Sequence, residues 1–336
     1  MRSSACHLNP AEAARRLGVS AKALRLYEQR GLVTPLRTAA GWRAYGPGEM
    51  ARAAEIVALR ALGLSLARVA QVLDGDAQAL EPALAAHQAA LEDQVQALVG
   101  AVAKVRDLRA DLARGQTPQA GDLGRLLAST AGPGIAFDLP WPWGGERFEL
   151  RDIGPLTYIT GPLGSGKTRL ALRLAQALPG ATYLGLDRAV QSASDPAPAA
   201  RVEQALAWLI EDGATESRAL RILLTALEAE TSAALVVDMP EQGLDQATQA
   251  AVVARLRGRG PRARPLFLLT RSSAILDLAA MGPHEALLYC PANHGPPLRV
   301  ASYPGAPGHE AVASCLASPD VRARTEGMVA VMGRTG

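Results

Sequence analysis

The residues best suited to chemistry form a glycine-rich run that follows a short apolar segment. Residues 161–168 read Gly-Pro-Leu-Gly-Ser-Gly-Lys-Thr, between an apolar run at 156–160 and a stretch with helical spacing at 169–174. In a strand, loop and helix of this kind, the backbone amides and the helix N-terminus cradle phosphate groups, and the lysine reaches the outer phosphates. The sequence therefore predicts an ATP site.

A pair of magnesium ligands is expected beside this loop. The hydroxyl of Thr168 suits Mg²⁺, and the apolar run at 233–237 ends in Asp238, where a Walker B aspartate would stand. Only three lysines occur in the chain, and Lys167 occupies the position where a compact ammonium group is needed. We expect Thr168 and Asp238 to hold the Mg²⁺ that accompanies ATP. The predicted nucleotide-binding residues are Gly161, Pro162, Leu163, Gly164, Ser165, Gly166, Lys167, Thr168, Arg169 and Asp238.

The first 75 residues have a different character. They contain eleven Arg and Lys residues against five Asp and Glu, whereas the rest of the chain contains 24 against 27, so the positive charge is concentrated where a nucleic-acid contact would need it. A short helix is expected over 10–18 and a second over 20–30, capped by Ser20 and stopped by Gly31. This is a helix-turn-helix pattern, whose second helix enters the major groove, and residues 37–45 form a loop or wing.

This segment closely resembles the MerR family of transcription regulators, and the resemblance extends through the following helix to about residue 115. It rests on Gly18-Val19-Ser20, Leu24-Arg25-Leu26-Tyr27-Glu28, Gly31-Leu32, Pro35, Arg37, Gly41-Trp42-Arg43-Ala44-Tyr45 and Arg60-Ala61-Leu62-Gly63-Leu64-Ser65-Leu66. Leu26 departs from it, since the family often has a second tyrosine there. The resemblance implies that DNA is faced by Lys22, Arg25, Tyr27, Arg37, Arg43 and Tyr45.

Some of these side chains have a second interpretation that the sequence leaves open. Tyr27 suits a half-buried core position as well as a DNA contact, and Trp42 suits packing of the wing as well as a DNA contact. Arg30, Arg52 and Arg68 are interpreted as solvated surface charges.

A single helix is predicted from about residue 79 to residue 114. Its apolar residues follow an alternating spacing of three, four or seven, which is typical of a coiled coil. The spacing is carried by Leu84, Leu91, Val95, Leu98, Val102, Val105 and Leu112. By resemblance to the MerR family, this helix forms an antiparallel homodimer, and a two-fold DNA site requires a dimer. The alternative is an amphipathic helix that covers its own domain.

A second resemblance begins near residue 135. The run Asp238-Met239-Pro240-Glu241-Gln242-Gly243-Leu244-Asp245 is similar to the Walker B and D-loop stretch of ABC-type ATPases, and residues 135–300 resemble their nucleotide domain. A signature-like helix is expected to open at Ser217. Trp141, Trp143 and Phe148 suit either stacking on the base or packing in the core.

At two positions of the ABC pattern, the residues that take part in ATP hydrolysis are replaced. Met239 replaces the glutamate that polarises water, and Arg271 replaces the switch histidine. Glu241 is a possible substitute base. A thioether accepts no proton, so we expect tight ATP binding with slow or absent hydrolysis.

The sequence thus predicts a multidomain chain of four parts. Residues 1–76 form an α-helical winged helix-turn-helix, 77–114 the dimerisation helix, 115–134 a linker, and 135–336 an α/β P-loop NTPase domain. No apolar run approaches a membrane span and no signal peptide is evident, which favours a cytoplasmic protein without membrane contact.

The predicted function is a homodimeric transcription regulator whose binding to promoter DNA, or distortion of it, is controlled by ATP. RNA polymerase is a further partner implied by the MerR resemblance. The alternatives are an active ATPase that the first domain targets to DNA, and a regulator of another ligand with a vestigial nucleotide fold.

Overall fold

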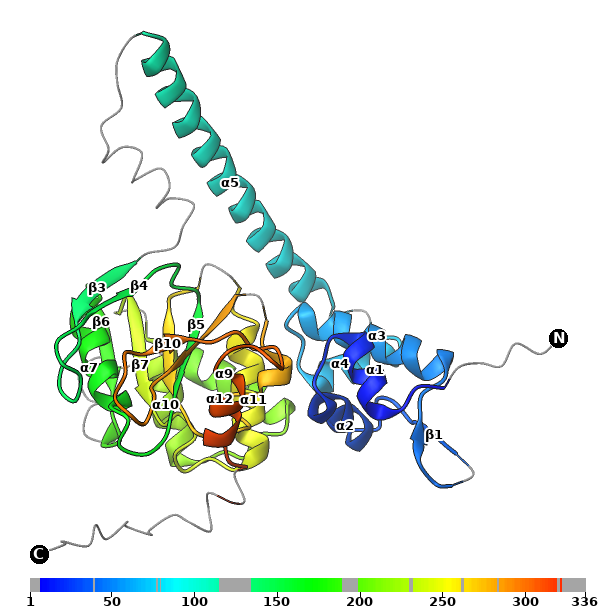
Figure 1. Cartoon of the computed structure of the whole chain (residues 1–336). Coiled ribbons are helices and arrows are strands. Elements are labelled where there is room, and N and C mark those ends of the chain that lie inside the picture. Colours follow the sequence, from blue (N-terminus) through cyan, green and yellow to red (C-terminus); the bar gives the residue numbers. More distant parts are fainter. Residues whose placement is uncertain are drawn as a thin grey trace, which may run out of the picture.

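The computed structural model describes residues 7–38, 40–76, 78, 80–114, 134–188, 199–229, 232–260, 263–282, 284–318 and 321. They form a helical N-terminal domain, one long helix and an α/β C-terminal domain (Figure 1). Of the predicted linker at 115–134, residues 115–133 lie outside the described residues.

The N-terminal domain is a helix-turn-helix with a small wing and two further helices. Its elements are α1 (Pro10–Leu17), α2 (Ala21–Gln29), β1 (Leu36–Arg37), β2 (Arg43–Ala44), α3 (Pro47–Ala61) and α4 (Leu66–Leu73). Gly18 ends α1 at a φ of 68°, a left-handed conformation that glycine adopts without strain. The Ser20 side chain accepts from the amide of Ala23 and so caps α2. Local capping therefore fixes the turn that was expected from the sequence.

The long helix α5 (Leu80–Ala113) projects away from both domains (Figure 1). Its apolar side chains are exposed, with Leu98 at 67% and Val95 at 56% of full exposure. The helix therefore does not cover a domain of its own chain along this face, and the alternative interpretation is wrong for these residues. An exposed apolar stripe is typical of a surface that binds a partner.

The C-terminal domain is built on a six-stranded sheet with the order β10-β9-β5-β8-β7-β6, in which only β10 runs antiparallel to its neighbour. The strands are β5 (Leu156–Thr160), β6 (Ala181–Leu184), β7 (Ala234–Asp238), β8 (Leu266–Leu269), β9 (Glu285–Tyr289) and β10 (Leu298–Arg299). A separate antiparallel hairpin is formed by β3 (Ile135–Asp138) and β4 (Arg147–Leu150).

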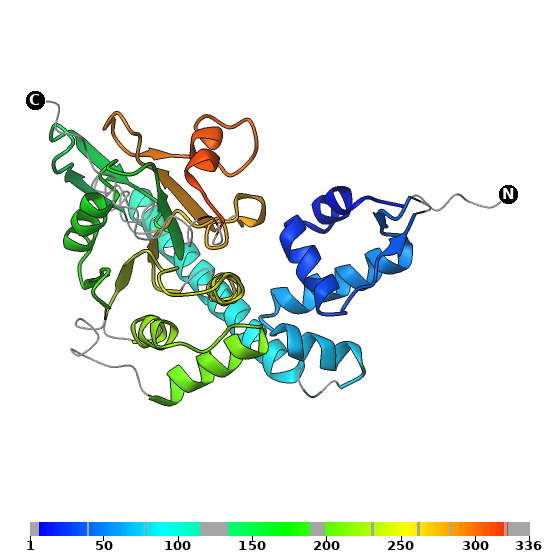
Figure 2. The same cartoon turned by 90° about the horizontal axis from the view of Figure 1, so that it is seen from below.

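Helices cover both faces of this sheet, as nearly continuous apolar strands require. Val236 and Phe267 pack on the side of α7 (Lys167–Ala177) and the hairpin, whereas their neighbours Val237 and Leu268 pack on the opposite side. That side holds α9 (Ala199–Glu211), α10 (Arg218–Glu228) and α11 (Gln246–Arg257), with α12 (His309–Cys315) nearby. The C-terminal end of α9 meets the N-terminal domain (Figure 2).

The strand order decides where chemistry can occur. Strand β8 lies between β5 and β7 and runs parallel to both. The carboxyl ends of these three strands therefore meet at one edge, which is where open α/β sheets bind their ligands. The phosphate loop follows β5, Asp238 is the last residue of β7, and Arg271 comes two residues after β8.

Candidate nucleotide site and DNA-binding surface

The phosphate loop connects β5 to α7 as the sequence predicts. Gly166 precedes α7 at a φ of 88°, and a Cβ atom on it would lie 2.6 Å from the indole of Trp143. A Cβ atom on Gly161 would lie 2.3 Å from the carbonyl oxygen of Cys290. Both glycines are thus required by the close approach of neighbouring groups. The exposed Leu163 and the buried Ser165 complete the loop.

The ammonium group of Lys167 lies within this loop. It donates to the carbonyl oxygens of Gly161 at 2.9 Å and Pro162 at 2.6 Å, and to the hydroxyl of Ser165 at 3.4 Å. Burial lowers the pKa of Lys167. A half-buried ammonium group is stabilised by an anion, and the phosphates of a nucleotide would provide that charge.

Thr168 and Asp238 come together although they are 70 residues apart. The Thr168 hydroxyl donates to Asp238 Oδ2 at 3.0 Å, and the Tyr183 hydroxyl donates to the same oxygen at 3.1 Å. A hydroxyl and a carboxylate at this spacing are hard oxygen ligands of the kind that Mg²⁺ takes beside a nucleotide. The residues present therefore fit Mg²⁺ with ATP, whose phosphates would supply negative charge beside the Lys167 ammonium group.

The positions that would activate water are unusual. Met239 has a φ of 47°, which is rare for a residue other than glycine, and its carbonyl accepts from the Arg188 guanidinium. The buried Glu241 accepts from the Thr270 hydroxyl at 3.0 Å and from the amide of Arg271 at 3.3 Å. Glu241 thus connects the Asp238 segment to the segment after β8. Its carboxylate holds this connection in place, which is a structural role.

The three upstream aromatic residues differ in their environment. Trp143 and Phe148 are buried in the core, so the packing interpretation is right for both. Trp141 is 71% exposed, and the guanidinium of Arg169 lies 5.1 Å from its ring centroid. Trp141 is therefore the one member of this trio available for stacking on a base beside the loop.

The predicted DNA-binding residues fall into two groups. Lys22 and Arg25 are exposed on α2, and Arg37 is exposed on the wing, where it donates to the carbonyl oxygen of Gly41 at 2.9 Å. Arg43, also on the wing, lies 3.3 Å from Glu28 and is partly exposed. Trp42 at the wing tip is 75% exposed, so it does not pack the wing.

Tyr27 and Tyr45 correct the expectation that all six residues face DNA. Both are buried in the core of the N-terminal domain. The Tyr45 hydroxyl donates to Glu28, and burial raises the pKa of Tyr27. Their rings hold the wing and α2 together, because an aromatic residue gains most by burying its apolar body.

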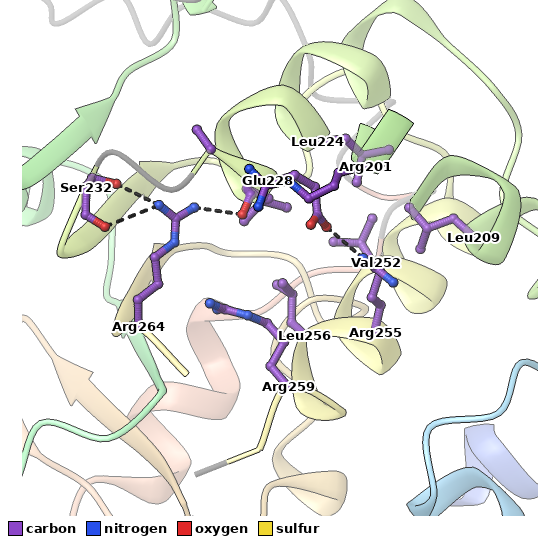
Figure 3. Close-up of a pocket in the computed structure, with 12 residues that line it drawn as sticks. Arg201, Leu209, Leu224, Glu228, Ser232, Val252, Arg255, Leu256, Arg259 and Arg264 are labelled. Atoms are coloured by element: carbon purple, nitrogen blue, oxygen red, sulfur yellow. Dashed lines mark hydrogen bonds and ion pairs between the residues drawn. The ribbon is translucent and has the colours of Figure 1, made fainter. Parts of the chain in front are cut away.

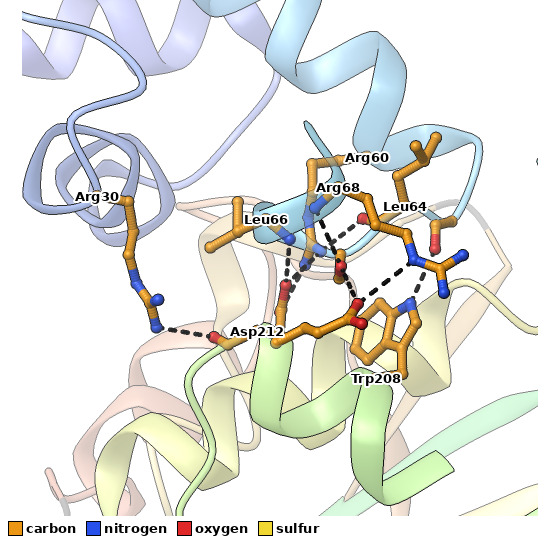
Figure 4. Close-up of polar contacts among 10 residues, drawn as sticks. Arg30, Arg60, Leu64, Leu66, Arg68, Trp208 and Asp212 are labelled. Carbon is orange, nitrogen blue, oxygen red and sulfur yellow. Dashed lines mark hydrogen bonds and ion pairs between the residues drawn. The ribbon is translucent and has the colours of Figure 1, made fainter. Parts of the chain in front are cut away.

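The N-terminal domain is held against the nucleotide domain by a charged contact at the end of α9 (Figure 4). Asp212, which is buried, accepts from Arg60 Nη1 at 2.7 Å and Nη2 at 3.0 Å, and from the amide of Leu66 at 2.8 Å. The indole nitrogen of Trp208 donates to the carbonyl oxygen of Gly63 at 3.1 Å. A bidentate arginine–carboxylate pair of this kind fixes orientation as well as distance.

Both ends of the predicted recognition helix α2 are bound to the nucleotide domain. At its start, Lys22 Nζ donates to the carbonyl oxygen of Ser273 at 3.1 Å. At its end, Arg30 donates to the carbonyl oxygen of Asp212 at 3.3 Å. Ser273 lies two residues after Arg271. The recognition helix is thus linked directly to the segment that follows the central strand of the nucleotide site.

The three arginines interpreted as solvated surface charges also have polar partners. Arg30 binds the carbonyl of Asp212, and Arg68 Nε lies 3.4 Å from Glu211. Arg52 donates to the carbonyl oxygens of Leu32 and Leu73. Arg30 and Arg68 are nevertheless exposed, so they are surface charges as expected, and Arg52 is partly exposed. The sequence did not predict their partners, because long-range partners of this kind leave no mark on local sequence.

Comparison with known proteins identifies the N-terminal part. The family model for MerR HTH family regulatory proteins matches residues 8–76. Over 106 residues, the chain is 33% identical to a probable heavy metal-dependent transcriptional regulator of Haemophilus influenzae, covering 30% of this chain and 83% of that protein. The chain belongs to the MerR family.

Solved structures similar to this MerR-family chain fall into two kinds. HiNmlR, a MerR family regulator lacking the sensor domain and bound to promoter DNA, is 25% identical with a TM-score of 0.22, covering 37% of this chain and 96% of that one. The ADP conformation of MJ1267, an ATP-binding cassette of an ABC transporter, is 14% identical with a TM-score of 0.32, covering 58% and 98%. At these scores the likeness is weak. The description of the C-terminal domain as an ABC-like P-loop domain rests on its own loop, Asp238 and strand order.

Among the described residues, no helix combines the length and apolar character that crossing a membrane would need. The same residues contain no group of three or more His, Cys, Asp or Glu side chains arranged to hold a metal ion.

Proposed function

We propose that this MerR-family protein is a homodimeric regulator of promoter DNA whose affinity for DNA is set by ATP at the phosphate loop. In this proposal, residues 1–76 bind DNA, 77–114 pair two copies and 135–336 bind ATP with Mg²⁺. Lys22, Arg25, Arg37 and Arg43 contact DNA, and RNA polymerase is a partner as it is for the family. The observation that carries the proposal is the bond between Lys22 on the recognition helix and Ser273 beside the nucleotide site.

Docking and DNA binding compete for the same helix. A helix in the major groove is flanked by phosphate backbones on both sides, so it needs free space along its length. Bonds from the nucleotide domain to Lys22 and Arg30 occupy that space at both ends of α2. The docked arrangement therefore opposes DNA binding.

The segment after β8 provides the link to the nucleotide. The side chain of Arg271 is exposed at the carboxyl end of the sheet, near the phosphate loop that follows β5. Attraction of this guanidinium toward a phosphate moves the backbone that carries Ser273, and the Lys22 bond breaks. We therefore expect ATP to weaken docking and strengthen DNA binding, by shifting a population between two arrangements.

Exposed apolar residues on α5 support pairing of two copies. Leu91, Val95, Leu98 and Val102 are all about half exposed or more. Burying such a stripe against a second α5 removes apolar area from water, which stabilises the dimer.

The test measures binding of a fluorescently labelled random-sequence duplex at low salt, with and without nucleotide. We expect Mg²⁺ with ATP to raise DNA affinity several-fold in the parent protein, and a non-hydrolysable analogue to act equally, because Met239 cannot serve as the general base. Lys167→Ala should remove the nucleotide effect and leave the basal DNA affinity. Arg299→Ala, an exposed arginine away from the loop, is the matched control.

Two results would overturn the proposal. One is a parent protein whose DNA affinity ignores ATP even though calorimetry shows that ATP binds. The other is an effect seen only with hydrolysable ATP together with rapid phosphate release, which would favour an active ATPase.

A further inference from the structure

A cavity lies on the side of the C-terminal domain opposite the phosphate loop. Its volume is about 380 Å³, within the range of small-molecule sites. Ser232 and Arg264, which line it, precede β7 and β8, whereas the phosphate loop follows the carboxyl end of β5. Since these strands are parallel, the two sites lie at opposite edges of the sheet.

The lining of this cavity combines an apolar wall with guanidinium groups (Figure 3). Leu209, Leu224 and Leu256 are almost fully buried and supply the apolar part. The charged residues among the described lining are four arginines and a single carboxylate, namely Arg201, Arg255, Arg259, Arg264 and Glu228. The described lining therefore carries an excess of positive charge.

Glu228 is already engaged by another residue. Its Oε1 accepts from Arg255 Nη2 at 2.7 Å. Arg264 is held by the Ser232 hydroxyl at 2.7 Å and by the carbonyl oxygens of Ala226 and Leu227 at 2.8 and 2.7 Å. These bonds fix the walls of the cavity. They also leave the one acidic group in the lining committed to Arg255.

Arg259 is in a different situation. In the described part of the chain its guanidinium has no hydrogen-bond or ion-pair partner, and its side chain extends into the cavity between Leu256 and Arg264 (Figure 3). Burial, and next to it the charge of Arg264, lower the pKa of Arg259 to about 10. A half-buried cation beside another cation is stabilised when an anion approaches.

We propose that this cavity binds a small organic anion that carries one carboxylate or phosphate group on an apolar body. The anionic group is bound by Arg259, whose planar fork of donors suits a carboxylate or phosphate bidentately. The apolar body lies against Leu209, Leu224 and Leu256. An inorganic anion alone lacks this second contact, and a neutral apolar molecule leaves Arg259 without its partner.

Binding in this cavity is expected to change the surroundings of residues at the contact with the DNA-binding domain. Helix α9 carries Arg201 in the cavity and ends beside Asp212, and Arg255 lies 5.9 Å from the ring centroid of Trp208. Trp208 in turn donates to Gly63. Because Arg255 lines the cavity and lies against the Trp208 ring, an anion bound at Arg259 changes the electrostatic surroundings of this indole, so its fluorescence reports occupancy.

The experiment uses the full-length protein and four probes: decanoate, decyl phosphate, decanol and inorganic phosphate. Binding is measured by calorimetry and by tryptophan fluorescence. We expect decanoate or decyl phosphate to bind at least tenfold more tightly than decanol and than inorganic phosphate. Arg259→Ala should weaken the anionic probe at least tenfold, and Arg259→Lys should restore part of the loss. Trp208→Phe should remove most of the fluorescence change while the calorimetric affinity stays.

Controls separate this site from the nucleotide site. Arg299→Ala should bind the probe as the parent does, and so should Lys167→Ala. Loss of binding in Lys167→Ala would place the probe at the phosphate loop and overturn the proposal. It is equally overturned if decanol binds as well as decanoate, if Arg259→Ala binds the probe as the parent does, or if neither anionic probe binds. Should Arg259→Ala fail to unfold cooperatively, the comparison of the four probes in the parent decides.

Discussion

The contact made by Asp212 gives the sharpest prediction. Its carboxylate accepts three hydrogen bonds, two from Arg60 and one from the amide of Leu66, all between 2.7 and 3.0 Å. Asp212→Asn keeps the shape but removes the charge and turns a donor toward Arg60. Removing one partner of a buried ion pair costs about 3–5 kcal/mol. Both groups are hydrated once the domains separate, so the cost falls on the docked arrangement.

This energy converts into a measurable shift. Since each 1.4 kcal/mol is a factor of ten, a loss of about 3 kcal/mol lowers the docking equilibrium constant about 100-fold. We expect Asp212→Asn to bind the random-sequence duplex more tightly than the parent without nucleotide, to gain little more from ATP, and to show a larger radius of gyration in X-ray scattering. Only molecules that are docked in the parent can be released by the substitution. The gain in DNA affinity is therefore limited by the fraction of parent molecules that are docked.

The matched control is Glu203→Gln on the same helix α9. Glu203 is exposed and pairs with Arg221 within the nucleotide domain, so neutralising it should leave docking and DNA affinity unchanged. The reasoning is refuted if Asp212→Asn folds normally yet keeps the parent's DNA affinity and radius of gyration.

Four further predictions concern the DNA-binding surface and the nucleotide site. Arg43→Ala should lower the slope of log affinity against log salt by about one, and an unchanged slope would place Arg43 off the DNA; Glu28→Gln, which frees Arg43 from its ion pair, should tighten binding. Met239→Glu should raise phosphate release at least tenfold, since a general base contributes about 10²–10⁴-fold, and an unchanged rate would show that the base alone is not what the site lacks. Gly166→Ala should destabilise the protein by about 1–3 kcal/mol in urea unfolding, because its Cβ meets Trp143, and a variant as stable as the parent would contradict this packing.

Local signals account for what the sequence predicted well. Ser20 caps α2 and Gly18 ends α1 because capping depends on residues three or four positions away. The apolar run that ends in Asp238 is likewise a local signal. It predicts β7 because a buried parallel strand is apolar throughout. The short distance between Thr168 and Asp238 was predictable because the phosphate-loop hydroxyl and the Walker B aspartate are expected to bind the same Mg²⁺ ion.

Contacts between the domains could not be predicted in this way. Asp212 follows a helix as an ordinary acidic residue, and nothing within ten positions indicates that Arg60 will bind it. Tyr45 was misinterpreted for a related reason, because an aromatic residue on a wing suits burial and DNA equally until its neighbours are placed. Arg259 likewise gave no signal, since its significance depends on Arg264 and Glu228, which come from other elements.

Attachment of α2 to the nucleotide domain has a consequence for how steeply the protein responds to its ligand. In the proposed dimer, a two-fold DNA site accepts one recognition helix from each copy, so both copies must be undocked at once. If each copy opens independently, the fraction of competent dimers is the square of the fraction of open protomers. A nucleotide that raises the open fraction about threefold then raises apparent DNA affinity about ninefold. If the proposed function is right, titration with ATP should therefore give a sigmoidal curve for DNA binding, even when each phosphate loop binds ATP independently of the other.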